Sequence, residues 1–359
     1  MGLQELTVRN FRLFEELVFI PDPYEVTVLL SPNGSGKTSV LEAVGALATG
    51  GSFRTPSASD LIRRGTDLAE VHGVLTQKER RVAIDLTVSR GERATTKRML
   101  VNGLRPTSRA AVAEVLPLTV FTPEGIDIVR HGAENRRAYL TTLLTDVDLT
   151  SGDIIERFAR VLTQRNALLR SVQGTVPTRT QRDELDVWSH DLAREGGRLV
   201  TQRETMVQEL KPLVAAFYEE LAHDGQATEV RYERSWTGDL ETALRSVVAD
   251  DWRRGYTSVG PHRDDLVLTL GGRDARRQAS QGEQRTLALA LRLAGHHLVQ
   301  RERDVNPLLL LDDVFSELDP LRADRLLHLL PRGQTLVTTA SPLPSGMQPA
   351  VVVDVTRSS

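Results

Sequence analysis

A glycine-rich segment joins a short apolar run to a helical one near the start of the chain. It reads Ser31-Pro32-Asn33-Gly34-Ser35-Gly36-Lys37-Thr38. In a phosphate-binding loop, backbone N–H groups at a helix N-terminus point at phosphate oxygens, a lysine reaches the β and γ phosphates, and a threonine hydroxyl ligates magnesium. We therefore expect these eight residues to bind the phosphates of a nucleotide, with Lys37 also catalytic and Thr38 also holding Mg²⁺. The alternative is an ordinary turn between a strand and a helix.

Two residues of this segment are unusual choices. Lys37 is one of only four lysines among 45 basic residues, so a compact ammonium is a minority choice in this chain. The first position of such a loop is normally glycine, and here it is Ser31. Backbone angles that glycine adopts freely cost a serine about 1 kcal/mol. We therefore expect a strained start of the loop, with nucleotide affinity more at risk than the fold.

A second candidate site is an acidic pair that follows the apolar run 308–311. Asp312 and Asp313 would lie at the carboxyl end of a buried strand, beside the phosphate loop. Because side chains alternate along a strand, Asp312 could hold Mg²⁺ while Asp313, the predicted catalytic base, faces the water that attacks the γ phosphate. The alternative is a pair of solvated aspartates that cap a strand end.

A third motif, Ser280-Gln281-Gly282-Glu283-Gln284, directly precedes a predicted helix and lies 32 residues before Asp312. The Ser280 hydroxyl and the Gly282 backbone would form another anion site at a helix N-terminus. Since the chain already has a phosphate loop, a second phosphate-binding group is useful where it contacts the nucleotide of another copy. The alternative is a capping box, because Ser280 and Glu283 have its spacing.

The elements that must position these residues follow from hydrophobic periodicity. Alternation predicts antiparallel strands at 6–9, 82–88 and 99–101, the last running into an Asn102-Gly103 hairpin turn. Helical spacing from about residue 152 predicts two helices separated by 174–178, more consistent with core packing than with a partner-binding coiled coil. The phosphate loop lies between a buried strand at 26–30 and a helix at 40–47. The remaining predicted elements are a strand at 266–270, a helix at 286–299, strands at 308–311 and 335–338, the latter the final one, and between them a helix at 321–330.

Composition excludes several classes of protein. The chain has 359 residues, a net charge of -3 and no cysteine, so a disulfide framework, a thiolate zinc site and a cysteine nucleophile are ruled out. The charge does not by itself point to nucleic acid or membrane as partner. No targeting or membrane-spanning segment is visible, and we expect a cytoplasmic protein.

The order of these motifs resembles that of the ATP-binding-cassette ATPases of the SMC and RecF type, and most closely the RecF family of bacterial recombination mediators. The resemblance covers nearly the whole chain except about residues 150–236. It rests on the three motifs above and on the segments Val8–Arg12, Phe53-Arg54-Thr55, Phe121–Glu124, Gly260–Asp265 and Asp313–Asp319.

The resemblance implies an α/β fold: an ABC-type ATPase head, with a mixed sheet and a phosphate loop, formed by residues 1–150 and 237–359, and an inserted α-helical lobe at 151–236. It implies ATP and Mg²⁺ as cofactors and a slow ATPase. It also implies an ATP-dependent homodimer in which Ser280 and Gly282 of one copy complete the site of the other. Such a dimer would hold DNA near junctions of duplex and single strand and act with RecO and RecR to load RecA.

Other interpretations remain open. The motor subunit of a transporter shares the loop and the signature, but such subunits commonly carry a histidine after the strand that follows the acidic pair, where this chain has threonines. A nucleotide-binding scaffold that no longer hydrolyses ATP, with Ser31 as the sign of decay, is the main alternative. The role of His262 is a separate question. Its side chain could act as a catalytic base, but we favour a structural role at a turn because Asp313 already supplies the base. Residues 151–211 carry ten basic and nine acidic side chains, so the DNA contacts stay unassigned.

Overall fold

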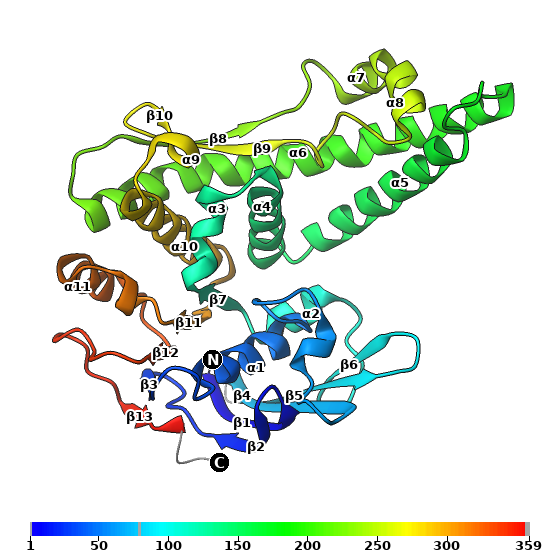
Figure 1. Cartoon of the computed structure of the whole chain (residues 1–359). Coiled ribbons are helices and arrows are strands. Elements are labelled where there is room, and N and C mark those ends of the chain that lie inside the picture. Colours follow the sequence, from blue (N-terminus) through cyan, green and yellow to red (C-terminus); the bar gives the residue numbers. More distant parts are fainter. Residues whose placement is uncertain (1, 78–79, 356–359) are drawn as a thin grey trace. The chain divides into compact units, whose positions relative to one another are not determined.

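The computed structural model describes residues 2–77 and 80–355, and these residues group into two compact units. The first unit comprises Met1–Gly125, Glu220–Ala222 and Arg292–Ser359, and the second comprises Ile126–Glu219 and His223–Leu291 (Figure 1). The expected helical lobe, residues 151–236, falls within the second unit apart from Glu220–Ala222. Its limits as a separate domain stay a prediction.

A parallel sheet in the first unit carries the predicted site. Among the described residues its order is β13-β3-β12-β11-β7. The strands are β13 (Val351–Val353), β3 (Val26–Leu30), β12 (Thr335–Thr339), β11 (Leu308–Asp312) and β7 (Leu118–Phe121). Thr338 pairs with Leu29 on one side and with Asp312 on the other. This register brings the carboxyl ends of β3, β12 and β11 to one edge of the sheet.

The expectation that 335–338 is the final strand is wrong, because β13 follows it and pairs with β3 at the sheet edge. The β-branched run Val351-Val352-Val353 was the signal for this strand. The helix between β11 and β12 is α11 (Pro320–Leu329), preceded by the 3-10 turn η3 (Phe315–Glu317).

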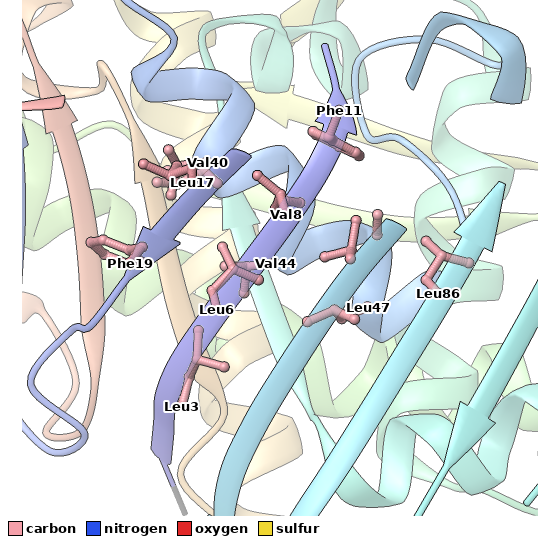
Figure 2. Packing of buried hydrophobic residues seen from close by; sticks show 14 of the residues in the cluster. Leu3, Leu6, Val8, Phe11, Leu17, Phe19, Val40, Val44, Leu47 and Leu86 are labelled. Atoms are coloured by element: carbon pink, nitrogen blue, oxygen red, sulfur yellow. The ribbon is translucent and has the colours of Figure 1, made fainter. Parts of the chain in front are cut away.

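An antiparallel sheet with the order β2-β1-β4-β5-β6 forms the other layer of the described first unit. Its strands are β1 (Gly2–Phe11), β2 (Phe14–Phe19), β4 (Leu68–Gln77), β5 (Arg80–Arg90) and β6 (Thr95–Val101). Helix α1 (Lys37–Thr49) packs Val40, Val44 and Leu47 against this sheet (Figure 2). Gly73 permits the close approach, since a Cβ there would lie 2.4 Å from Leu47 Cδ1. Full burial of each such side chain stabilises the unit by about 1.5–3 kcal/mol, so the helix that follows the phosphate loop is firmly anchored.

The predicted hairpin turn after β6 is confirmed. Asn102 and Gly103 have φ values of 50° and 79°, and Val101 and Leu104 bond each other across them. Two successive positive φ angles are what a two-residue hairpin turn requires. The other short elements of this unit are η1 (Ala58–Leu61), α2 (Arg109–Val115) and η2 (Pro123–Ile126), whose last residue belongs to the second unit.

Two long helices dominate the second unit, as the periodicity predicts. α5 (Ser151–Ser171) lies beside α6 (Arg179–Ala222) (Figure 1). α6 continues through Pro212, and Gly196 lets Leu240 approach, since a Cβ there would lie 2.7 Å from Leu240 Cδ2. The remaining elements are α3 (Asp127–Arg130), α4 (Ala133–Val147), β8 (Thr228–Glu233), α7 (Leu240–Ser246), α8 (Val248–Arg254), β9 (Asp265–Leu270), β10 (Arg273–Asp274), α9 (Ala275–Gln278) and α10 (Gln281–Arg303). The residues of α10 from Arg292 onward belong to the first unit. Within residues 2–77 and 80–355, no helix combines the length and the apolar character needed to span a bilayer.

Candidate nucleotide-binding site

The glycine-rich segment forms a loop between β3 and α1, as predicted. Gly34 and Gly36 have φ values of 84° and 102°, which L side chains rarely adopt. A Cβ at Gly36 would also lie 2.6 Å from Phe14 Cζ. No side chain caps the N-terminus of α1, so its first N–H groups are available to an anion. In the described part of the chain the buried Ser35 Oγ has no hydrogen-bond partner.

The expected strain at Ser31 is wrong. The φ angle of Ser31 is not positive, so a serine can adopt this backbone conformation as easily as a glycine. The Ser31 Oγ lies 2.9 Å from Asp354 Oδ1 and accepts a hydrogen bond of 3.0 Å from the Val355 N–H. A side chain contact to the end of the chain therefore holds this position where most such loops rely on glycine.

Lys37 lies inside the loop and is 6% exposed. Its Nζ donates hydrogen bonds to the backbone oxygens of Ser31 and Pro32. Burial lowers the pKa of Lys37, and the negative charges of Asp313 and Asp312 partly oppose that shift. A buried ammonium held by carbonyl oxygens is ready to bind an anion that enters the loop.

Asp312 joins the phosphate loop to the sheet edge. Its Oδ1 accepts hydrogen bonds from Thr38 Oγ1 at 2.8 Å and Thr338 Oγ1 at 2.7 Å. Burial raises the pKa of Asp312, because the charged form is desolvated. One hydroxyl and one carboxylate fit Mg²⁺, which usually takes one or two protein ligands and completes its shell with water and phosphate oxygens. The described residues contain no cluster of three or more His, Cys, Asp or Glu for a metal held by protein alone.

Asp313 reaches the site by a different route from the one expected. β11 ends at Asp312, and Asp313 has a φ of 49°, a left-handed conformation that aspartate tolerates better than most residues. Its N–H donates to the Thr338 carbonyl at 3.1 Å and lies 3.0 Å from Thr338 Oγ1. A backbone turn, not strand alternation, therefore aims the side chain. Among described groups, Asp313 Oδ1 is buried without a hydrogen-bond partner.

These side chains surround a cavity of about 270 Å³. Its lining consists of Leu13, Asn33, Gly34, Gly36, Lys37, Thr38, Ser39, Arg54, Asp313 and Thr338. The functional assignment from sequence missed Arg54, which lies 3.7 Å from the fully buried Glu42. Glu42 also accepts hydrogen bonds from Arg12 and Ser52. The detectable signal was a glutamate within the apolar helix 40–47, since such a buried charge requires a cationic partner.

The Ser280 motif lies in the second unit and forms the capping box. The Ser280 N–H donates to Glu283 Oε2 at 2.6 Å, and the Glu283 N–H to Ser280 Oγ at 3.3 Å. Hydrogen bonds from Gln226 and Ser280 lower the pKa of Glu283 to about 2. Ser280 is exposed and Gly282 half-buried. The structure therefore confirms that Ser280 and Glu283 form a capping box. Because Ser280 is exposed, the motif is accessible to another molecule.

His262 has the structural position that the sequence favoured. Its Nε2 donates to the Thr257 carbonyl at 3.0 Å, and its ring lies 6.1 Å from that of Phe158. Among described groups the buried Nδ1 has no partner. Burial lowers the pKa of His262 to about 4, and the positive charges of Arg263, Arg137 and Arg165 add to the shift. The ring is therefore a neutral packing group in this unit.

A neutral buried histidine makes stability depend on pH. The unfolded chain takes up the proton near pH 6.5, whereas the folded chain does so only near pH 4. We expect no loss above pH 6.5 and a loss of about 3 kcal/mol as the pH falls from 6.5 to 4. Chemical unfolding across this range should give a shallower slope for His262→Gln. The exposed His328→Gln should keep the parent slope; an unchanged slope in His262→Gln would contradict the prediction.

Comparisons with known proteins identify the family of the chain. Residues 2–344 match the family model described as RecF/RecN/SMC N terminal domain. The DNA replication and repair protein RecF of Geobacter sulfurreducens is 37% identical over 352 residues, covering 94% of this chain and 93% of its own. The RecF of Streptomyces avermitilis is 34% identical over 354 residues, covering 95% and 94%.

Solved structures show the same fold. The recombination mediator protein RecF bound to ATP, of the RecFOR pathway, has a TM-score of 0.87 and 27% identity, covering 98% of this chain and 94% of that one. An Smc head bound to the C-winged helix domain of ScpA has a TM-score of 0.54 at 16% identity, covering 99% and 91%, and supports the fold alone. The predicted ATPase-head fold is confirmed, and the chain belongs to the RecF family.

Proposed function

We propose that this protein is an ATP-dependent recombination mediator of DNA replication and repair, whose ATP-bound dimer holds DNA. The observation that carries the proposal is the cavity between the phosphate loop and the carboxyl ends of β11 and β12. Lys37, Thr38 and Asp313 line this cavity, and Asp312 accepts a hydrogen bond from Thr38. The buried Ser35 Oγ and Asp313 Oδ1 have no partner among described groups. Buried polar atoms without a hydrogen-bond partner are expected around a phosphate loop where a bound charged ligand supplies the missing hydrogen bonds.

Each residue has a distinct role in this proposal. Residues 31–38 bind the phosphates through backbone N–H groups, and Lys37 neutralises the β and γ phosphates. Thr38 and Asp312 would hold Mg²⁺, which supplies charge neutralisation at the phosphates. Asp313 orients and deprotonates the attacking water through its buried oxygen. A buried, unpartnered carboxylate oxygen beside the phosphate loop supports hydrolysis over the alternative of a scaffold that only binds nucleotide.

The second half of the site comes from another copy of the chain. Ser280 is exposed at the start of α10 and held by the capping box. In an ATP-bound homodimer its hydroxyl and the Gly282 backbone would contact the γ phosphate bound by the partner copy. ATP binding would thereby control dimerisation, and ATP hydrolysis would let the two copies separate.

The partners follow from the relatives. A RecF of the RecFOR pathway is described as a recombination mediator, which supports DNA, RecO and RecR as partners of this chain. The family resemblance adds RecA, loaded at junctions of duplex and single-stranded DNA. Such a role places the protein in the cytoplasm, and we propose that DNA accelerates its ATP turnover.

Ser280→Arg is expected to abolish ATP-dependent dimerisation, because a bulky side chain blocks the phosphate contact. Sedimentation velocity with and without ATP and Mg²⁺ measures the change. The parent should dimerise with ATP and then bind duplex, single-stranded and junction DNA more tightly, and affinity should fall as salt rises. Ser280→Arg should remain monomeric and lose the effect of ATP on DNA binding.

Two further variants separate this effect from damage to the fold. Ser280→Asp keeps an N-cap for α10 but places a negative charge against the phosphate, so it should also fail to dimerise. Ser246→Arg adds the same arginine at an exposed serine of α7 in the same unit and should dimerise like the parent. A parent that stays monomeric with ATP would refute the proposed site.

A further inference from the structure

Hydrogen bonds connect Ser31, the first residue of the phosphate loop, to Asp354 and Val355 at the end of the described chain. The Ser31 Oγ accepts a 3.0 Å hydrogen bond from the Val355 N–H, and it lies 2.9 Å from Asp354 Oδ1 and 2.6 Å from the Leu30 carbonyl. Ser31 is 5% exposed and Val355 3% exposed. A glycine at position 31 could make none of these side-chain contacts, so this connection depends on the unusual residue.

The same residue also contacts the loop lysine. The Ser31 carbonyl accepts a hydrogen bond from Lys37 Nζ. A chain of hydrogen bonds therefore connects Val355 and Asp354, through Ser31, to Lys37. Lys37 is buried, and its ammonium is held by the backbone oxygens of Ser31 and Pro32.

The strand that brings these residues to the loop is independently anchored. β13 pairs in parallel with β3 through Val351, Val352 and Val353, and the Ala350 N–H donates to the Val26 carbonyl at 2.9 Å. Removing the Ser31 hydroxyl would leave this pairing in place. The loss would fall on the loop start and on the buried Val355 N–H, which would lose its acceptor.

We propose that Ser31 is a positioning residue for the nucleotide, and that Asp354 and Val355 belong to the nucleotide site because they hold Ser31 in place. The hydroxyl fixes the loop start against Asp354 and Val355, and the Ser31 carbonyl then holds the Lys37 ammonium where phosphate enters. The proposal rests on the proposed ATP-binding function. One consequence is that Ser31→Gly, which introduces the usual first residue of such loops, weakens nucleotide binding in this protein.

Calorimetric titration with ADP and ATP tests the proposal. Ser31→Ala and Ser31→Gly should each bind nucleotide about tenfold more weakly, the scale of one lost buried hydrogen bond to a charged group. Asp354→Ala should also weaken binding, and the double variant Ser31→Ala with Asp354→Ala should be no weaker than Ser31→Ala. Affinities within twofold of the parent in both Ser31 variants, or single effects that multiply in the double variant, would overturn the proposal.

A second measurement needs no substitution. Hydrogen exchange of peptides that cover residues 351–355 should slow when ADP binds the parent, and the slowing should be absent in Ser31→Ala. A purely structural role of Ser31 would leave the effect of ADP on exchange unchanged between the two proteins. No slowing in the parent would overturn the proposal even where a variant fails to fold.

Two controls complete the design. Val352 lies on the same strand and is 54% exposed, so Val352→Ala should bind nucleotide like the parent; a tenfold loss there would reduce the Ser31 effect to general disturbance of β13 and overturn the proposal. Lys37→Ala separates the two hypotheses. If the parent binds ATP, Lys37→Ala does not, and Ser31→Ala binds like the parent, the proposed function stands and only the role of Ser31 fails.

Discussion

Lys37→Ala is expected to lower ATP turnover about 100-fold or more, and to weaken ATP binding, because it removes the only ammonium that lines the described cavity. Lys37 is 6% exposed and held by the Ser31 and Pro32 carbonyls. Its charge is thus placed before the nucleotide arrives and needs little rearrangement. Phosphate release under saturating ATP and Mg²⁺, with and without DNA, measures the turnover.

Matched variants make this prediction specific. Lys97→Ala removes a lysine at an exposed position of β6 and should leave turnover unchanged. Lys37→Arg keeps the charge, but a planar guanidinium is a poor fit for a site shaped for a compact ammonium, so turnover should stay low. Lys37→Ala with the parent rate would refute the assignment of the site.

Asp313→Asn separates hydrolysis from binding. The asparagine tolerates the left-handed backbone of position 313 and keeps the shape of the side chain, but it cannot take a proton from water. We expect ATP-dependent dimerisation to persist while turnover falls. A parent with no measurable turnover, and no difference in Asp313→Asn, would instead favour the nucleotide-binding scaffold.

Local sequence signals were sufficient for the centre of the site. The glycines at 34 and 36 must adopt positive φ, and the apolar runs at 26–30 and 308–311 are buried strands, so their order along the chain predicts the loop and the acidic pair at one sheet edge. The Thr38–Asp312 hydrogen bond confirms that these two residues lie together. Their assigned roles toward ATP and Mg²⁺ stay predictions.

Features that depend on distant segments were not accessible to the same reasoning. The bonds from Ser31 to Asp354 and Val355 span more than 320 residues, and no local pattern reports them. The turn that aims Asp313 depends on its N–H reaching Thr338 in the adjacent strand. A motif gives residue types and spacing, whereas the side-chain contacts of Ser31 and the backbone turn at Asp313 depend on tertiary structure.

The polar core of the second unit was likewise invisible from the sequence. Arg165 and Asp251 are both fully buried and joined by a 2.8 Å hydrogen bond between Nη1 and Oδ2. Arg165 also donates to Ser189 and Thr257, and Asp251 Oδ1 accepts from the Ser258 N–H and hydroxyl. The network ties α5 to α6, to α8 and to the turn that follows α8.

Asp251→Ala is expected to lower the free energy of unfolding of this unit by about 3–5 kcal/mol, because it leaves the Arg165 guanidinium buried without a counter-charge. Burial lowers the pKa of Arg165 and its interactions with Asp251 oppose that shift, because desolvation disfavours the charged guanidinium. Denaturant unfolding monitored by tryptophan fluorescence measures the change, since Trp188, Trp236 and Trp252 belong to this unit.

An exposed pair of similar geometry in the same unit provides the control. Arg234 makes two hydrogen bonds of 2.6 and 2.7 Å to Glu204, with side chains 40% and 35% exposed. Glu204→Ala should cost only about 1 kcal/mol or less, because water solvates the remaining charge. The double variant Arg165→Met with Asp251→Leu should recover much of the stability lost in Asp251→Ala, since no charge stays buried. Equal losses in Asp251→Ala and Glu204→Ala would mean that burial does not set the strength of these pairs.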